Sequence, residues 1–161
     1  MILVLGAGRK KFGGAVTLDR DRSLGTDIVC NLGVDCIPID SDICELVIAI
    51  HVLEHIGKFG ETREWFQFWE EIYRVMKPDS MLQFESPKWN SVWAWADPSH
   101  VRVISPETFA FLDQNNYSDQ QSIISPFRIK CDMILTEAHD LDANFFAGTL
   151  QARKPLKTWW Y

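Results

Sequence analysis

The sequence predicts an α/β fold whose centre is an open, doubly wound and mostly parallel sheet. Three observations support this fold class. Short apolar runs at residues 1–8, 15–19 and 46–51 end in glycine or polar residues, as do strands that carry a ligand site at their carboxyl ends. Residues 65–76 show the three- and four-residue apolar spacing of an amphipathic helix. Residues 123–137 and 144–152 predict an antiparallel strand pair that closes the sheet.

Composition narrows the class of protein. A chain of 161 residues, 47% of them hydrophobic, fits a single domain over residues 1–161 with a substantial core. The formal charge of −6 disfavours a protein that mainly grips nucleic-acid phosphate. No apolar run reaches the roughly 20 residues of a membrane span, and the basic residues 9–11 follow the first apolar run, unlike those of a signal peptide. We therefore expect a cytoplasmic protein with no membrane partner.

Four cysteines, at positions 30, 36, 44 and 131, form no C-x-x-C pair. Most of them sit in or beside apolar runs, where a free thiol behaves as a small hydrophobic side chain. We expect buried, reduced thiols.

The connections in the first third of the chain are short. The strand at 15–19 follows the first after about eight residues, whereas a parallel crossover normally needs a dozen or more. The third strand, at 26–32, is reached through an equally short segment. The sequence thus predicts a Rossmann-like sheet whose first crossover helices are reduced to turns or lost.

The later elements follow from periodicity and from helix-boundary residues. Pro78 stops the helix at 65–76, and Ser105 with Pro106 is typical of an N-cap and first helical position. The predicted elements after the third strand are a strand at 45–50, the helix at 65–76, a strand at 81–85, a long loop at 88–100 and a helix at 106–114. The tail KPLKTWWY is either packed or exposed.

Glycines follow the first strand. Gly6-Ala7-Gly8 lets the backbone approach a ligand closely, because glycine has no Cβ and tolerates positive φ. A complete dinucleotide fingerprint would place a third glycine where Lys11 stands. NAD and FAD are therefore disfavoured.

Polar residues also end the second and third strands. Asp19 stands where a carboxylate can accept hydrogen bonds from both hydroxyls of a ribose, and Asn31 can donate and accept at an adenine edge. Both residue types are also common in simple turns, and that alternative stays open.

Five segments in order resemble one family: LVLGAGRKKFGGAVTLDRD, IVCNLG, CIPIDSDICELVIAIHVLEHI, EEIYRVMKPDS and WADPSHVRVISPETFAFL. Together they resemble class I S-adenosylmethionine-dependent methyltransferases, in particular the methyltransferase type 11-like branch, over roughly residues 2–113. The resemblance implies an S-adenosylmethionine cofactor, with S-adenosylhomocysteine as its product, bound by Gly6, Ala7, Gly8, Asp19, Asn31, Leu32 and His51.

This sequence departs from the family pattern at several positions. Arg9 or Lys10 replaces the third small residue of the glycine loop, Asn31 stands where Asp is usual, and Glu45 replaces a customary Asp before the fourth strand. A lid over the cofactor would have to come from elsewhere, and the Trp-rich loop at 88–100 is the obvious source.

The acceptor side is less defined. His55 and His100 are the candidates for a general base, since histidine titrates near neutral pH, although each could equally cap or brace a turn. Tryptophans of the loop could stack on a planar or sugar acceptor or simply pack. We assign to acceptor binding the residues Trp93, Trp95, Asp97 and Arg102.

Two other functions remain open. The chain could keep the fold and the cofactor as a scaffold without turnover. It could alternatively be a zinc hydrolase that uses His51, Glu54 and His55 as an H-x-x-E-H site. That site needs one continuous helix, which the strand-like run before His51 and the glycines at 57 and 60 disfavour, so no metal is expected. We expect an unidentified methyl acceptor as partner, and retain a homodimer as an expected assembly.

Overall fold

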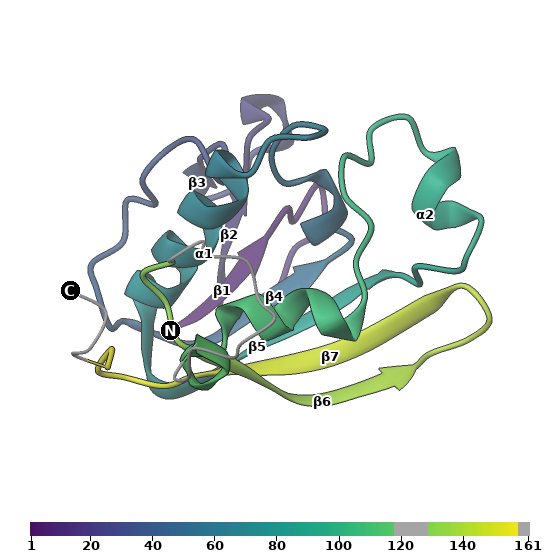
Figure 1. Ribbon diagram of the computed structural model, residues 1–161. Helices are drawn as coiled ribbons and strands as arrows, with labels where there is room; N and C mark the ends of the chain where they lie inside the picture. Colours follow the sequence, from purple (N-terminus) through teal and green to yellow (C-terminus); the bar gives the residue numbers. More distant parts are fainter. Residues whose placement is uncertain (118–128, 158–161) are drawn as a thin grey trace.

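The computed structural model describes residues 1–117 and 129–157, and its centre is a seven-stranded sheet, drawn as arrows in Figure 1. The strand order is β3-β2-β1-β4-β5-β7-β6. The strands are β1 (Ile2–Leu5), β2 (Ala15–Asp19), β3 (Ile28–Val29), β4 (Cys44–Ile50), β5 (Met76–Pro87), β6 (Met133–Asp140) and β7 (Phe145–Ala152). Strands β1 to β5 pair in parallel, and β7 pairs antiparallel with both β5 and β6. This topology confirms the predicted doubly wound sheet with an antiparallel C-terminal pair.

The first two crossovers contain almost no helix, as predicted. A turn joins β1 to β2, and only the 3₁₀ turn η1 (Arg22–Leu24) precedes β3. Strand β3 is much shorter than the predicted 26–32. Its neighbour Asp27 accepts hydrogen bonds from the backbone N–H and the hydroxyl of Thr17 at 2.8 and 2.7 Å, so a side chain supplies bonds that a longer ladder would make.

One face of the sheet carries the helices. Helix α1 (Arg63–Val75) ends three residues before Pro78, as predicted, and β5 follows at once. The predicted second helix is the 3₁₀ helix η3 (Pro106–Leu112), capped by Ser105 and Thr108. Trp69 of α1 contacts Phe109 of η3 at 5.9 Å between ring centroids, and Phe109 contacts Phe84 of β5 at 4.6 Å. Both helices therefore share one core.

The opposite face is covered less completely. Val47 and Ala49 of β4 point to the helical face and are fully buried, whereas Leu46 and Ile48 are only partly buried and Ile50 is 38% exposed. An unbroken apolar run is typical of a strand buried on both faces, but this face of β4 is only partly buried. The short early crossovers provide no helix to cover it.

The remaining elements before β6 are short helical turns. The predicted loop at 88–100 contains one helical turn, α2 (Trp93–Ala96), and two 3₁₀ turns, η2 (Leu53–His55) and η4 (Gln114–Tyr117), flank the core. The predicted strand 123–137 begins only at Met133 in the structure; its residues 123–128 and the tail residues 158–161 lie outside the described residues.

The fold also determines which cysteine thiols are buried. All four cysteines are free; three are buried, and burial raises the pKa of Cys30 to about 11. Cys36 is exposed, contrary to the prediction, because it lies in the connection before β4. Within the described ranges no helix has the length and apolar character needed to cross a membrane.

Candidate functional site

The sheet reverses its winding between β1 and β4, and the carboxyl ends of these strands lie side by side. Gly6 and Gly8 both adopt positive φ there, at 55° and 59°. A Cβ on Gly6 would lie 2.7 Å from Val52 Cγ2, whereas a Cβ on Gly8 would meet no atom within 4 Å. The loop therefore packs on one side and leaves open space beside Gly8.

Asp19 closes the same loop from the end of β2. Its Oδ2 accepts a hydrogen bond from the Gly8 N–H at 3.0 Å, and its Oδ1 accepts one from the Asp21 N–H at 3.0 Å. A carboxylate has about four lone-pair sites, so Asp19 keeps acceptor capacity for further donors such as ribose hydroxyls. The open backbone at Gly8 and this carboxylate fit an adenosyl cofactor.

The predicted adenine-side residues lie one strand further out. Asn31 is exposed and its backbone N–H donates to Asp35 Oδ2 at 2.8 Å, while Leu32 is partly buried against the core. They were predicted at the end of the third strand, but β3 ends at Val29 and both residues lie in the connection that follows it.

His51 directly follows Ile50, the last residue of β4, and has a positive φ of 54°. Its backbone N–H donates to the Glu85 carbonyl at 2.9 Å, and its ring lies edge-on to Phe145 at 5.0 Å between centroids. Nδ1 lies 3.5 Å from Glu54 Oε1, and Nε2 lies 3.1 Å from Glu85 Oε1. Glu54 and, to a lesser degree, Glu85 raise the pKa of His51, against the opposing effect of burial.

His55 and His100 come together although they are far apart in sequence. Their rings lie edge to face at 4.7 Å between centroids. The segment after α2 brings His100 here, because the N–H groups of Val101 and Arg102 donate to the Glu54 carbonyl at 2.9 and 3.2 Å. Since β4 runs to Ile50 and η2 spans only three residues, the continuous helix of an H-x-x-E-H peptidase site is absent from this segment.

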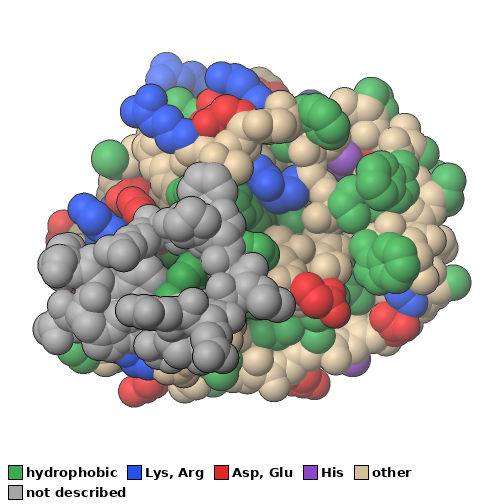
Figure 2. Space-filling view, in the orientation of Figure 1, with side chains coloured by type: hydrophobic (Ala, Val, Ile, Leu, Met, Phe, Trp, Pro, Cys, Tyr) green, Lys and Arg blue, Asp and Glu red, His purple; other side chains and the backbone are tan. Residues whose placement is uncertain are grey.

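The residues predicted for the acceptor occupy different surroundings. Trp93 and Trp95 are exposed, and Figure 2 shows hydrophobic side chains gathered on the side where α2 lies. Asp97 braces a turn, as its Oδ1 accepts hydrogen bonds from the N–H and hydroxyl of Ser99. Arg102 packs over Trp65 and donates to the Glu61 carbonyl at 3.0 Å, which gives it a structural contact.

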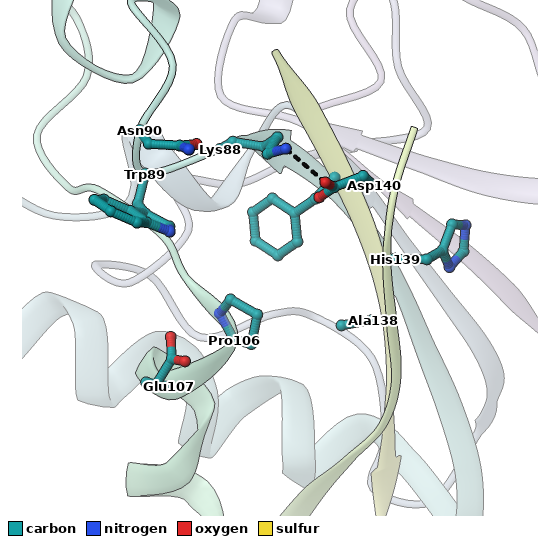
Figure 3. A pocket seen from close by; sticks show the side chains of 9 residues that line it. Lys88, Trp89, Asn90, Pro106, Glu107, Ala138, His139 and Asp140 are labelled. Atoms are coloured by element: carbon teal, nitrogen blue, oxygen red, sulfur yellow. Dashed lines mark hydrogen bonds and ion pairs between the residues drawn. The ribbon is translucent and has the colours of Figure 1, made fainter. Parts of the chain in front are cut away.

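A cavity of about 340 Å³ opens beside the end of β5, between η3 and the β6–β7 hairpin (Figure 3). Lys88 and Asp140 form an ion pair of 2.6 Å across it. Trp89 and Glu107 line it from the loop and from η3. Sequence reasoning did not single out this set, apart from Trp89, because its members come from three distant segments. Glu85 was missed as a site residue, although it could be found as the acidic residue that ends the predicted strand 81–85, and Glu54 was considered only as part of the H-x-x-E-H alternative.

Comparison with known proteins identifies the fold. No family model matches the chain, and no curated protein matches it in sequence. Solved structures do match. A SAM-dependent methyltransferase from Archaeoglobus fulgidus superposes with a TM-score of 0.61 at 16% identity, covering 93% of this chain and 85% of the other. One from Methanosarcina mazei gives a TM-score of 0.62 at 12% identity, covering 94% and 92%.

A third match sets a limit on what the fold implies. The cyclase SpnF superposes with a TM-score of 0.58 at 12% identity, covering 94% of this chain and 75% of that one. A shared fold does not determine the reaction. The chain has the Rossmann-like fold of class I S-adenosylmethionine-dependent methyltransferases.

Proposed function

We propose that this chain binds S-adenosylmethionine and transfers its methyl group to an acceptor. The observation that carries the proposal is the loop at the winding reversal, where the open backbone of Gly8 is hydrogen bonded to the Asp19 carboxylate at 3.0 Å. Ligands of open α/β sheets bind at this position, beyond the carboxyl ends of the strands. The matching fold of solved methyltransferases supports the choice of cofactor.

The predicted cofactor residues would each border one part of S-adenosylmethionine at the carboxyl ends of the strands. Gly6, Ala7 and Gly8 would border the methionine and ribose part, and Asp19 the ribose hydroxyls. Asn31 and Leu32 would border the adenine, and His51 the reactive centre. When bound, the cofactor would supply an electrophilic methyl group, so the protein contributes mainly orientation and exclusion of water.

The acceptor would lie toward the cavity beside β5. The cavity combines an aromatic ring, Trp89, with the Lys88–Asp140 ion pair, which suits a small molecule with a planar or sugar-like part and polar substituents. Trp93 and Trp95 belong to the same loop as Trp89, residues 88–100. Of the residues predicted from sequence, His55 and His100 would handle a proton of the acceptor.

Calorimetric titration with S-adenosylmethionine and S-adenosylhomocysteine tests cofactor binding. We expect saturable binding that Asp19→Ala weakens by at least about 1 kcal/mol, a low figure for a charge-assisted hydrogen bond. Asp21→Ala is the matched control: it removes the same charge from a neighbour whose carboxylate caps η1 at Ser23, and should leave affinity unchanged. The absence of binding at millimolar ligand would exclude the proposal. Binding without a methylated product over an acceptor panel would favour a scaffold.

A further inference from the structure

A second cluster of chemical groups lies beside the proposed cofactor edge, and its properties do not depend on that proposal. Glu54, His55 and His100 each offer one ligand atom, and these three atoms lie within 4.8 Å of one another. Two imidazoles and one carboxylate are a common ligand set for zinc and for other divalent first-row transition metals.

Glu54 is the most informative member, because it is a carboxylate only 2% exposed. Its Oε2 accepts a hydrogen bond from the Ser86 hydroxyl at 3.1 Å. Its Oε1 has no hydrogen-bond partner among residues 1–117 and 129–157, and the His51 ring 3.5 Å away makes only an ion-pair contact. A buried carboxylate oxygen without a hydrogen bond is costly, and a metal ion bound there would take the place of the long contact to His51.

The two histidines are each arranged to leave one ring nitrogen for a ligand. His55 Nδ1 lies 3.2 Å from the Ser99 carbonyl oxygen and 3.3 Å from the Ser99 hydroxyl, which itself donates to Asp97 Oδ1. Both oxygens can therefore accept from a protonated Nδ1, and this tautomer leaves the Nε2 lone pair for a ligand. His100 Nε2 lies 3.8 Å from Asp97 Oδ2. His100 Nδ1 is buried and without a hydrogen-bond partner in the described part of the chain.

Metal-binding histidines characteristically direct their second nitrogen to a carbonyl or carboxylate; the Ser99 carbonyl lies in hydrogen-bond range of His55, and the Asp97 carboxylate lies 3.8 Å from His100, in ion-pair range. We propose that Glu54, His55 and His100 form a site for one divalent transition-metal ion, with zinc as the best-suited probe. Donors on one zinc ion lie roughly 3.3 Å apart, given bonds of about 2.0–2.1 Å, so the three ligand atoms, which lie within 4.8 Å of one another, would have to draw closer together on binding.

This site differs from the H-x-x-E-H arrangement considered in the sequence. His51 is not a ligand, and His100 takes its place from a segment 45 residues beyond His55 in the chain. An ion held here would lower the pKa of a coordinated hydroxyl group. The metal ion would then activate the acceptor, and His55 and His100 would act as its ligands and not as general bases.

Zinc titration of the full chain, stripped of metal and in a Cys36→Ser background, tests the site without any cofactor. Cys36 is replaced because it is the exposed thiol. We expect one zinc ion per chain and a rise in thermal stability on binding. Glu54→Gln and His100→Gln should each weaken zinc binding at least about tenfold and reduce the stability gain; Asp97→Asn, which alters a partner of a ligand, should weaken it about tenfold.

His139→Gln is the matched control, since this exposed histidine contacts Glu137 on β6 and lies outside the cluster. It should leave zinc binding unchanged. Circular dichroism establishes that each variant is folded, and if Glu54→Gln does not fold, His100→Gln decides the question. A parent chain that binds no zinc at micromolar concentration, or zinc binding that survives the ligand substitutions, would overturn the proposal. Failure of cofactor binding would leave it intact.

Discussion

Two glycines in one loop experience different constraints, although both have positive φ. Replacing Gly8 by Ala adds a methyl group in open space, so the main cost to folding is the left-handed backbone, about 1–2 kcal/mol. Replacing Gly6 by Ala adds the same backbone cost and a 2.7 Å approach to Val52, an overpacking that costs roughly 1–3 kcal/mol more.

We therefore expect urea denaturation to show a lower free energy of unfolding for Gly6→Ala than for Gly8→Ala. Adding Val52→Ala should relieve the Gly6→Ala defect, which a double-mutant cycle measures as a favourable coupling. Calorimetry should show the reverse order for the cofactor, with Gly8→Ala weakening S-adenosylmethionine binding more. Equal stability of the two single variants would mean that Val52 moves aside without cost.

Residues at strand ends could be placed from sequence, because parallel strands bring their carboxyl ends to one edge of the sheet. Gly6, Asp19 and His51 were predicted in this way. The meeting of His55 with His100 was not predictable, since it depends on the path of the loop and on the two hydrogen bonds that the Glu54 carbonyl accepts. No periodicity in the sequence encodes such a path.

At the scale of elements, α1 is tied to the connection before β4 by a pair of charged side chains. Arg74 donates to the carbonyls of Ile39 and Ile37 at 2.7 and 2.8 Å, and Glu71 Oε2 accepts from the Ile37 N–H at 2.9 Å. Arg74 and Glu71 also pair directly at 2.8 Å. A chain segment without regular structure is thus held by one turn of a helix.

This arrangement predicts a pH dependence of stability. The hydrogen bond from Arg74, supported by that from Ile37, lowers the pKa of Glu71 in the folded state despite the opposing effect of burial. Stabilisation from Glu71 is therefore complete above its unfolded pKa of about 4.3 and is lost as pH falls through the lower folded value.

Glu71→Gln should lower the free energy of unfolding by about 1–2 kcal/mol at pH 7, and the difference from the parent should shrink below about pH 4. Urea titrations at several pH values measure both. Glu70→Gln, on the same helix, is a control for general loss of negative charge, although its carboxylate accepts one bond from the Lys130 N–H. A difference that stays constant down to pH 3 would contradict the role given to Glu71 ionisation.

The element types were predictable where hydrophobic spacing decides them, as in α1 and β7. Two lengths were not. Strand β3 begins only at Ile28, because the Asp27 side chain bonds to Thr17 where the predicted ladder would start, and η3 keeps the predicted Ser105 cap but winds as a 3₁₀ helix that ends at Leu112. Side-chain hydrogen bonds that compete with backbone pairing leave no distinctive spacing in the sequence.

At the scale of the whole molecule, one arginine connects the end of the sheet to the helical layer. Arg153 follows β7 and pairs with Asp113, after η3, and with Asp132, before β6. Its backbone carbonyl accepts from the Tyr73 hydroxyl of α1 at 2.7 Å. The Asp132 side chain is only 2% exposed, and its Oδ1 also accepts from the Gln114 N–H at 3.0 Å.

Arg153→Met should therefore destabilise the protein more than an average surface substitution, because it leaves the Asp132 carboxylate buried without a counter-charge. We expect a loss of about 2–4 kcal/mol, below the upper range for a fully buried pair since Arg153 is itself partly exposed. Adding Asp132→Asn keeps an oxygen for Gln114 and removes the buried charge, so the double variant should recover part of this loss. Denaturant unfolding of the single and double variants measures the recovery. If the double variant is less stable than Arg153→Met alone, the buried charge is not the source of the lost stability. The loss would then come from the packing of the arginine stem.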